Sequence, residues 1–155
     1  MSDHAPVRYL VLGLLATLAL AGCGGDIDPA TTPAGRAQVK YLQDLYQGRF
    51  GPAYDTLHPA YKKIVSRSQF SDCAASTIPV GQLDSIEVLD VFDDPVQIPD
   101  AGEQKAKAVR VRITSTSGQT LEPFVSHEVE IAGRWTWVMN DDAVAAYQAG
   151  RCPGA

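Results

Sequence analysis

The side chains of this sequence that could do chemistry are its three cysteines and a few histidine and tyrosine residues. Cys23 follows an apolar run, Tyr9 to Ala21, from which one glycine separates it. Cys73 and Cys152 lie far apart, and no Cys-x-x-Cys or Cys/His spacing typical of a zinc site occurs. The cysteines therefore predict covalent modification or pairing rather than a metal centre, and no metal is expected.

The apolar run is too short to span a bilayer core, which needs about 20 residues, but it suits the hydrophobic region of a signal peptide. Leu20-Ala21-Gly22-Cys23 resembles the lipobox of bacterial lipoproteins. This resemblance implies a signal peptide over residues 1–22, cleavage before Cys23, and diacylglycerol on the Cys23 sulfur. The alternative is an ordinary secretory signal with an incidental cysteine.

Acylation at Cys23 would hold the protein on the extracytoplasmic face of the cell membrane, because two or more acyl chains give stable anchoring. Cys73 and Cys152 would then be the two remaining thiols of an exported protein, which predicts a disulfide between them. The alternative, a reactive thiol, is disfavoured because Cys73 follows Asp72 rather than a basic residue.

The composition is that of one mildly acidic domain. The 155 residues carry a formal charge of −5, and removal of the first 22 would leave 133 residues, enough for an independent core. The negative charge argues against nucleic acid as a partner, because nucleic-acid binding requires a basic surface. It also argues against membrane attachment through a cluster of basic residues that bind anionic lipid.

The segments in chain order predict helices followed by strands. After a flexible tether over residues 23–33, Thr32 and Pro33 are an N-cap and first residue for a helix over 33–47. A short helix should end before His58-Pro59. A third should cover about 67–76, because Ser66 and Gln69 have capping-box spacing at its start. Alternating patterns then predict strands at 83–92, 109–113, 121–131 and 135–139, with a turn-rich connection over 93–102. Asn140-Asp141-Asp142 should cap a short C-terminal helix.

These elements predict a single α+β domain over residues 34–155, with N-terminal helices packed on a curved antiparallel sheet of about four strands. In the strand 121–131, alternation places His127 on the apolar, inward face with Val125 and Val129. The same alternation places Ser126, Glu128 and Glu130 toward solvent, together with Arg110 and Arg112 of the preceding strand.

Several segments resemble nuclear-transport-factor-2-like domains. The segment Tyr-Leu-Gln-Asp-Leu-Tyr-Gln-Gly-Arg-Phe-Gly-Pro-Ala-Tyr-Asp-Thr-Leu-His-Pro is similar to their first helices, and Gly-Arg-Trp-Thr-Trp-Val is similar to their closing strand. The resemblance covers about residues 35–140 and implies a cone with an internal pocket. Some members, such as ketosteroid isomerase and polyketide cyclases, are enzymes, whereas many others are scaffolds or binding modules.

Enzymes of that family place an Asp or His base with a Tyr inside the cone. His127, Tyr46, Tyr54 and Trp135 are accordingly the candidate pocket residues. No carboxylate falls on an expected inward position, so no catalytic residue and no cofactor are assigned.

Two functions follow from the resemblances. The first is a lipid-anchored, non-catalytic binding or accessory module of the bacterial cell envelope, whose partner is another envelope protein or a small apolar ligand. The alternative is a small pocket enzyme of the isomerase or cyclase type. A buried carboxylate or histidine paired with a tyrosine would favour the enzyme.

Overall fold

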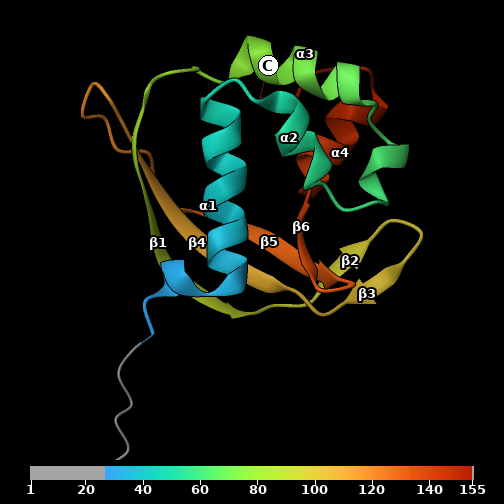
Figure 1. Cartoon of the computed structure of the whole chain (residues 1–155). Coiled ribbons are helices and arrows are strands. Elements are labelled where there is room, and N and C mark those ends of the chain that lie inside the picture. The colour runs from blue at the N-terminus through green and yellow to red at the C-terminus, as the bar shows by residue number, and fades with distance from the viewer. Residues whose placement is uncertain (1–26, 155) are drawn as a thin grey trace, which may run out of the picture.

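The computed structural model describes residues 27–154 and shows an α+β domain, which confirms the predicted fold class (Figure 1). The predicted signal peptide and Cys23 lie outside the described residues. The helices are η1 Pro29–Thr31, α1 Pro33–Tyr46, α2 Phe50–Asp55, η2 Tyr61–Lys63, α3 Arg67–Thr77 and α4 Asp141–Gln148. The strands are β1 Leu83–Asp93, β2 Val96–Ile98, β3 Gly102–Gln104, β4 Lys107–Ser115, β5 Phe124–Ile131 and β6 Arg134–Val138.

Three helices begin at the caps that local sequence predicts. The Thr32 hydroxyl accepts a hydrogen bond from the Gly35 N–H, and the Ser66 hydroxyl accepts one from Gln69. The Asn140 side chain accepts one from Ala143, two residues into α4. Each cap satisfies a backbone donor that the helix itself leaves unpaired.

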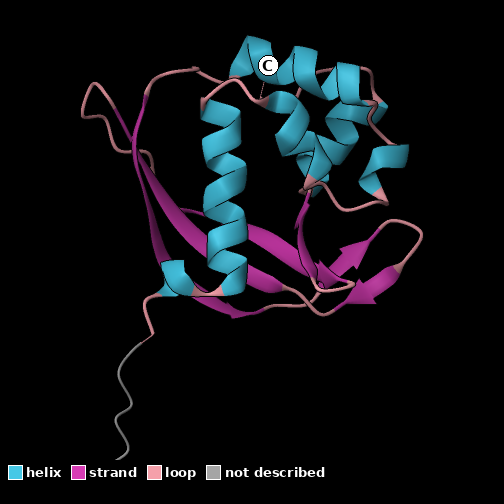
Figure 2. Ribbon diagram, in the orientation of Figure 1, coloured by secondary structure: helices cyan, strands magenta, loops and turns pink. Residues whose placement is uncertain are grey.

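The main sheet is antiparallel in the order β1-β4-β5-β6, and α1 contacts all four of its strands (Figures 1 and 2). In β4, Val109, Val111 and Ile113 are buried whereas Arg110 is exposed and Arg112 is half-buried. Register irregularities in β1, between Leu83 and Ser85 and between Val88 and Asp90, are of the kind that bends an edge strand. The apolar face of the sheet is thereby wrapped around one helix.

Two elements were not predicted from the sequence. The connection after β1 folds back as the β2–β3 hairpin, with Asp100 in its turn at a φ of 61° and Ile98 buried. At the start of the described chain, η1 forms within the expected tether and contacts both α1 and β1. Gly35 allows this approach, because a Cβ there would lie 2.2 Å from the carbonyl oxygen of Pro29.

The helical layer is joined to the sheet by backbone hydrogen bonds, and a disulfide joins α3 to the segment after α4. The Trp137 N–H donates to the Thr56 carbonyl at 2.8 Å and the His58 N–H donates to the Trp137 carbonyl at 2.9 Å, so residues 56–58 pair with the edge of β6. Cys73 of α3 is bonded to Cys152, just past α4, with Cα atoms 5.2 Å apart, within the span a disulfide allows.

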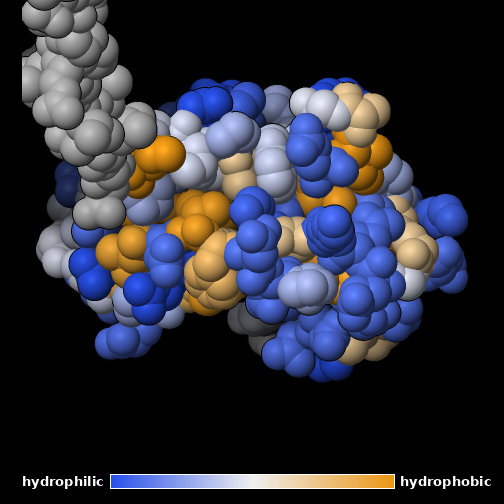
Figure 3. All heavy atoms as spheres, turned by 90° about the horizontal axis from the view of Figure 1, so that it is seen from below, coloured by the Kyte–Doolittle hydropathy of each residue, from blue (hydrophilic) through white to orange (hydrophobic). Residues whose placement is uncertain are grey.

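The surface of the domain is mixed. Figure 3 shows one face on which hydrophobic residues are interleaved with hydrophilic ones. Large exposed apolar side chains include Phe92, Leu121, Phe124 and Val125. Within residues 27–154, no helix has both the length and the apolar character needed to cross a membrane.

Candidate functional site

A cavity of about 580 Å³ lies where α1, η2, the start of the β2–β3 hairpin, β5, β6 and the start of α4 meet. This volume is in the range of small-molecule sites. Its wall is largely apolar and aromatic, with Tyr41, Tyr61, Phe124 and Trp137 among the lining residues. A second cavity of about 230 Å³ also has Tyr41 and Trp137 in its wall.

Gln38 is the most unusual residue of the larger cavity. Its side chain is fully buried, yet neither its amide nitrogen nor its amide oxygen has a hydrogen-bond partner among residues 27–154. Gln38 shares one face of α1 with Tyr41, Leu42 and Leu45, which follow it by three, four and seven residues. The helix therefore presents one free amide group in an otherwise apolar and aromatic stripe.

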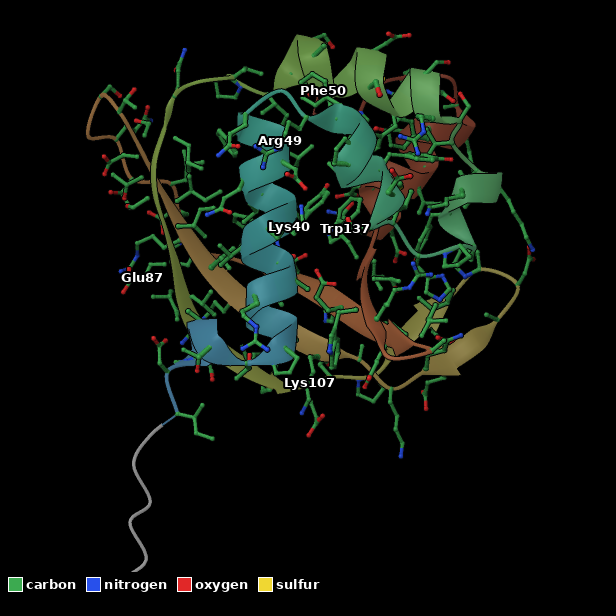
Figure 4. The ribbon with its side chains drawn as sticks, viewed as in Figure 1. Lys40, Arg49, Phe50, Glu87, Lys107 and Trp137 are labelled. Atoms are coloured by element: carbon green, nitrogen blue, oxygen red, sulfur yellow. A yellow bond between two sulfur atoms is a disulfide. The ribbon has the colours of Figure 1, made fainter. Side chains whose placement is uncertain are left out.

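Tyr41 and Trp137 form the aromatic wall between the two cavities. Their rings stack at a centroid distance of 4.5 Å and an interplanar angle of 18°. The Trp137 indole N–H donates to the Ser126 hydroxyl at 2.9 Å, which fixes the ring against β5. Figure 4 shows Trp137 beside α1, on the strand that faces the helix. Burial raises the pKa of Tyr41 well above its usual value, with smaller contributions from Tyr147 and Glu128.

His127 lines the cavity and pairs with Asp94. The two side chains are 2.8 Å apart between Nε2 and Oδ2, and about a quarter of the His127 side chain is exposed. Asp94 lies directly after β1, so the pair joins the end of one edge strand to the inner strand β5. With Nε2 protonated, the imidazole donates to the carboxylate, which orients the ring.

Glu128 is a buried carboxyl group that sequence reasoning placed in solvent. The residue is 1% exposed, and its Oε1 has no hydrogen-bond partner among the described residues. Burial raises its pKa to about 8, because the low-dielectric surroundings disfavour the charged form. Near neutral pH the group is therefore mostly protonated.

The register of β5 corrects the predicted faces of this strand. Ser126 is opposite Val109 and Glu128 is opposite Trp137, so these polar residues share the face that turns toward α1. His127 is opposite Ala108, on the other face, and it lines the cavity with the preceding residues of the first half of β5. Val129 is also buried, at 3% exposed, so β5 is covered on both faces. The alternation of polar and apolar residues along β5 therefore does not identify the face that is turned toward α1.

The candidate pocket residues are dispersed. His127 lines the larger cavity, whereas Tyr46, Tyr54 and Trp135 lie outside both cavities. The Tyr54 hydroxyl donates to the Val65 carbonyl at 3.1 Å, and its ring contacts Phe70. Tyr46 is buried at the end of α1, and Trp135 is half-buried against the core.

The residues that sequence reasoning missed are Gln38, Tyr41, Glu128 and Trp137. A signal for two of them was present, because Gln38 and Tyr41 share the helical stripe of Leu42 and Leu45 and the one polar member of such a stripe is a candidate ligand contact. No group of three or more His, Cys, Asp or Glu side chains within residues 27–154 could hold a metal ion.

Comparison of the chain with models of known protein families and with curated proteins gave no match.

Proposed function

We propose that this protein is a lipid-anchored module of the bacterial cell envelope whose domain binds a small, largely apolar ligand in the cavity beside Gln38. The lipobox-like segment ending at Cys23 supports the anchor and the extracytoplasmic location. The α+β arrangement is compatible with the proposed resemblance to nuclear-transport-factor-2-like domains, many of which are binding modules. The acidic charge of the chain agrees with attachment through lipid rather than through basic residues.

The observation that carries this proposal is the buried, unpaired amide of Gln38 in a cavity of about 580 Å³. A buried polar group without a partner costs roughly 1–3 kcal/mol, so a folded protein gains by giving it one. A ligand group that both donates and accepts hydrogen bonds would satisfy the amide, while the aromatic wall covers an apolar body. The site is thus complementary to a ligand with one polar end.

Ligand binding can be measured through Trp137. The sequence has two tryptophans, so a Trp135→Phe background leaves Trp137 as the only indole reporter, in the wall of both cavities. Titration of the purified protein with 3-phenylpropan-1-ol should change the Trp137 emission and raise Tm. Gln38→Leu should weaken this binding about tenfold, the loss of a hydrogen bond of ~1.4 kcal/mol.

Gln43→Leu is the matched control, because Gln43 is an exposed glutamine of the same helix. It should leave the affinity unchanged. Absence of any emission or Tm change in the wild-type protein would contradict the proposed cavity function.

The anchor has an independent test in cells of a lipoprotein-processing bacterium. The wild-type protein should lack residues 1–22, carry lipid by mass spectrometry and stay with membranes after a carbonate wash. Cys23→Ala should carry no lipid, whereas Cys152→Ser, a control at another cysteine, should keep it. A wild-type protein without lipid would contradict the anchor.

A small acid–base enzyme is the second candidate, and the His127–Asp94 pair in the cavity wall favours it. An imidazole oriented by a carboxylate can remove a proton next to a carbonyl group, and the hydroxyl of Tyr41, which lines the same cavity, could donate to the resulting oxyanion. Exchange of α-protons of cyclohexanone in D₂O, followed by NMR, would detect this activity. Loss of the exchange in His127→Asn would support the enzyme, and absence of exchange in wild type would exclude it for this ketone.

A further inference from the structure

The charged groups of the larger cavity are of one sign. Its lining contains two aspartates, Asp94 and Asp141, and no lysine or arginine among the residues that the structure describes. His127 is the one lining side chain that can become cationic, and Asp94 already pairs with it. An anionic ligand would thus meet two carboxylates without a fixed positive charge.

Two lysines of the flanking elements are paired with other carboxylates. Lys40 of α1 binds Asp44 at 2.6 Å, and Lys107 of β4 binds Asp93 at 2.7 Å. Figure 4 shows Lys107 at the lower edge of the domain, away from Trp137. Because these two lysines are paired elsewhere, they do not neutralise the negative charges of Asp94 and Asp141 in the cavity wall.

Asp141 and the aromatic ring of Tyr61 line the same cavity. Burial raises the pKa of Tyr61, and the negative charge of Asp141 raises it further. Asp141 is exposed at the start of α4. Tyr61, Tyr41 and Trp137 add aromatic rings to the lining, and their faces attract cations.

From these features we propose that the cavity selects an organic cation: a protonated amine on an apolar or aromatic body, with the ammonium group between Asp141 and Asp94 and a hydrogen bond from the ligand to Gln38. This inference rests on the proposed ligand-binding function and names its ligand class. The acidic groups alone would not indicate a ligand, but the fully buried, unpaired Gln38 amide in the same cavity is an independent indication of one.

The test compares three probes of one carbon skeleton: 3-phenylpropylamine, 3-phenylpropan-1-ol and 3-phenylpropionate. With the Trp137 reporter, the amine should bind at least tenfold more tightly than the alcohol, and the carboxylate should bind most weakly. Asp141→Asn should reduce the preference for amine over alcohol several-fold, and Asp94→Asn should act in the same direction.

Asp142→Asn is the matched control, because Asp142 lies in the same first turn of α4 and is exposed but does not line the cavity. It makes the same charge change and should leave the preference intact. Equal affinity for amine and alcohol, or equal loss in Asp142→Asn, would overturn the cation selectivity while leaving ligand binding in place. Failure of all three probes to bind would overturn both proposals.

Discussion

Glu128 is the residue whose surroundings differ most from those its polarity suggests. Its carboxyl group is enclosed between the sheet and α1, and its pKa is raised to about 8 by burial, from an ordinary value of 4.5. Such a group costs stability whenever it is ionised. The fold tolerates it because the neutral acid is the predominant form at neutral pH.

This position predicts a pH dependence of folding. The folded state retains the Glu128 proton up to a higher pH than the unfolded chain does. The contribution of this proton to the free energy of unfolding is therefore fully present below about pH 4.5 and is lost as pH rises through about 8. Each unit of pKa difference corresponds to ~1.4 kcal/mol, so the loss amounts to several kcal/mol. Glu128→Gln should flatten this decline in urea unfolding measured between pH 5 and 9.

Glu130→Gln is the control, because Glu130 lies on the same strand and is exposed. It should leave the decline in place. An unchanged pH profile in Glu128→Gln would show that the carboxyl group is not enclosed as described.

At the scale of the elements, the turn between α1 and α2 is organised by one buried carboxylate. The Asp44 side chain is fully buried and binds Lys40 at 2.6 Å and the Arg49 Nε at 2.8 Å, while its backbone carbonyl accepts from the Arg49 N–H (Figure 4). Burial by itself would raise the pKa of Asp44, but the hydrogen bonds and charges of Lys40 and Arg49 outweigh it, so the pKa is lowered.

Asp44→Asn should therefore destabilise the domain by ~2 kcal/mol, the loss of charge-assisted hydrogen bonds to a buried group. A carboxylate with a lowered pKa stabilises above its unfolded value of 3.8 and loses this effect as pH falls through the folded value. The cost of the substitution should accordingly shrink below about pH 4. Unfolding midpoints of both proteins at pH 3 and 7 measure it, and an equal cost at both values would contradict the charge-based account.

The elements also show which features a single sequence can predict. Thr32, Ser66 and Asn140 act as caps through contacts within three residues, so their role is visible locally. The β2–β3 hairpin has strands of three residues, too short for a periodic pattern, and its formation depends on packing of Ile98. The inward position of Glu128 is set by pairing with Lys107 and Trp137, which are distant in sequence.

The residues of the candidate site likewise differ in how far they could be predicted from local sequence. His127 could be identified from the sequence because it is one of three histidines and lies on a clearly predicted strand. Its partner Asp94 could not be identified, because it is 33 residues away on another element. Trp135 and Trp137 lie on the same face of β6, and Trp137 is distinguished only by its stacking on Tyr41 in the cavity wall. Local pattern thus located the elements, whereas the cavity arises from their pairing.

At the scale of the molecule, the disulfide between Cys73 and Cys152 encloses both sheets, because all six strands lie between these residues. In the chain-entropy account, a loop of this size stabilises the fold by ~4 kcal/mol through restriction of the unfolded chain. Reduction should lower the free energy of unfolding by about this amount in denaturant titrations. The double variant Cys73→Ser/Cys152→Ser should match the reduced protein and be insensitive to reductant; an oxidised protein no more stable than the reduced one would contradict the prediction.

The disulfide also determines what a protease could release from the membrane. Residues 73–152 form a covalent ring, and the proposed attachment at Cys23 lies outside it, on the N-terminal side. A single cut within the ring, for example in the exposed β2–β3 turn at Asp100, would leave both fragments joined. A nicked domain would then remain on its tether, and shedding of the whole ring would require a cut between the anchor and Cys73.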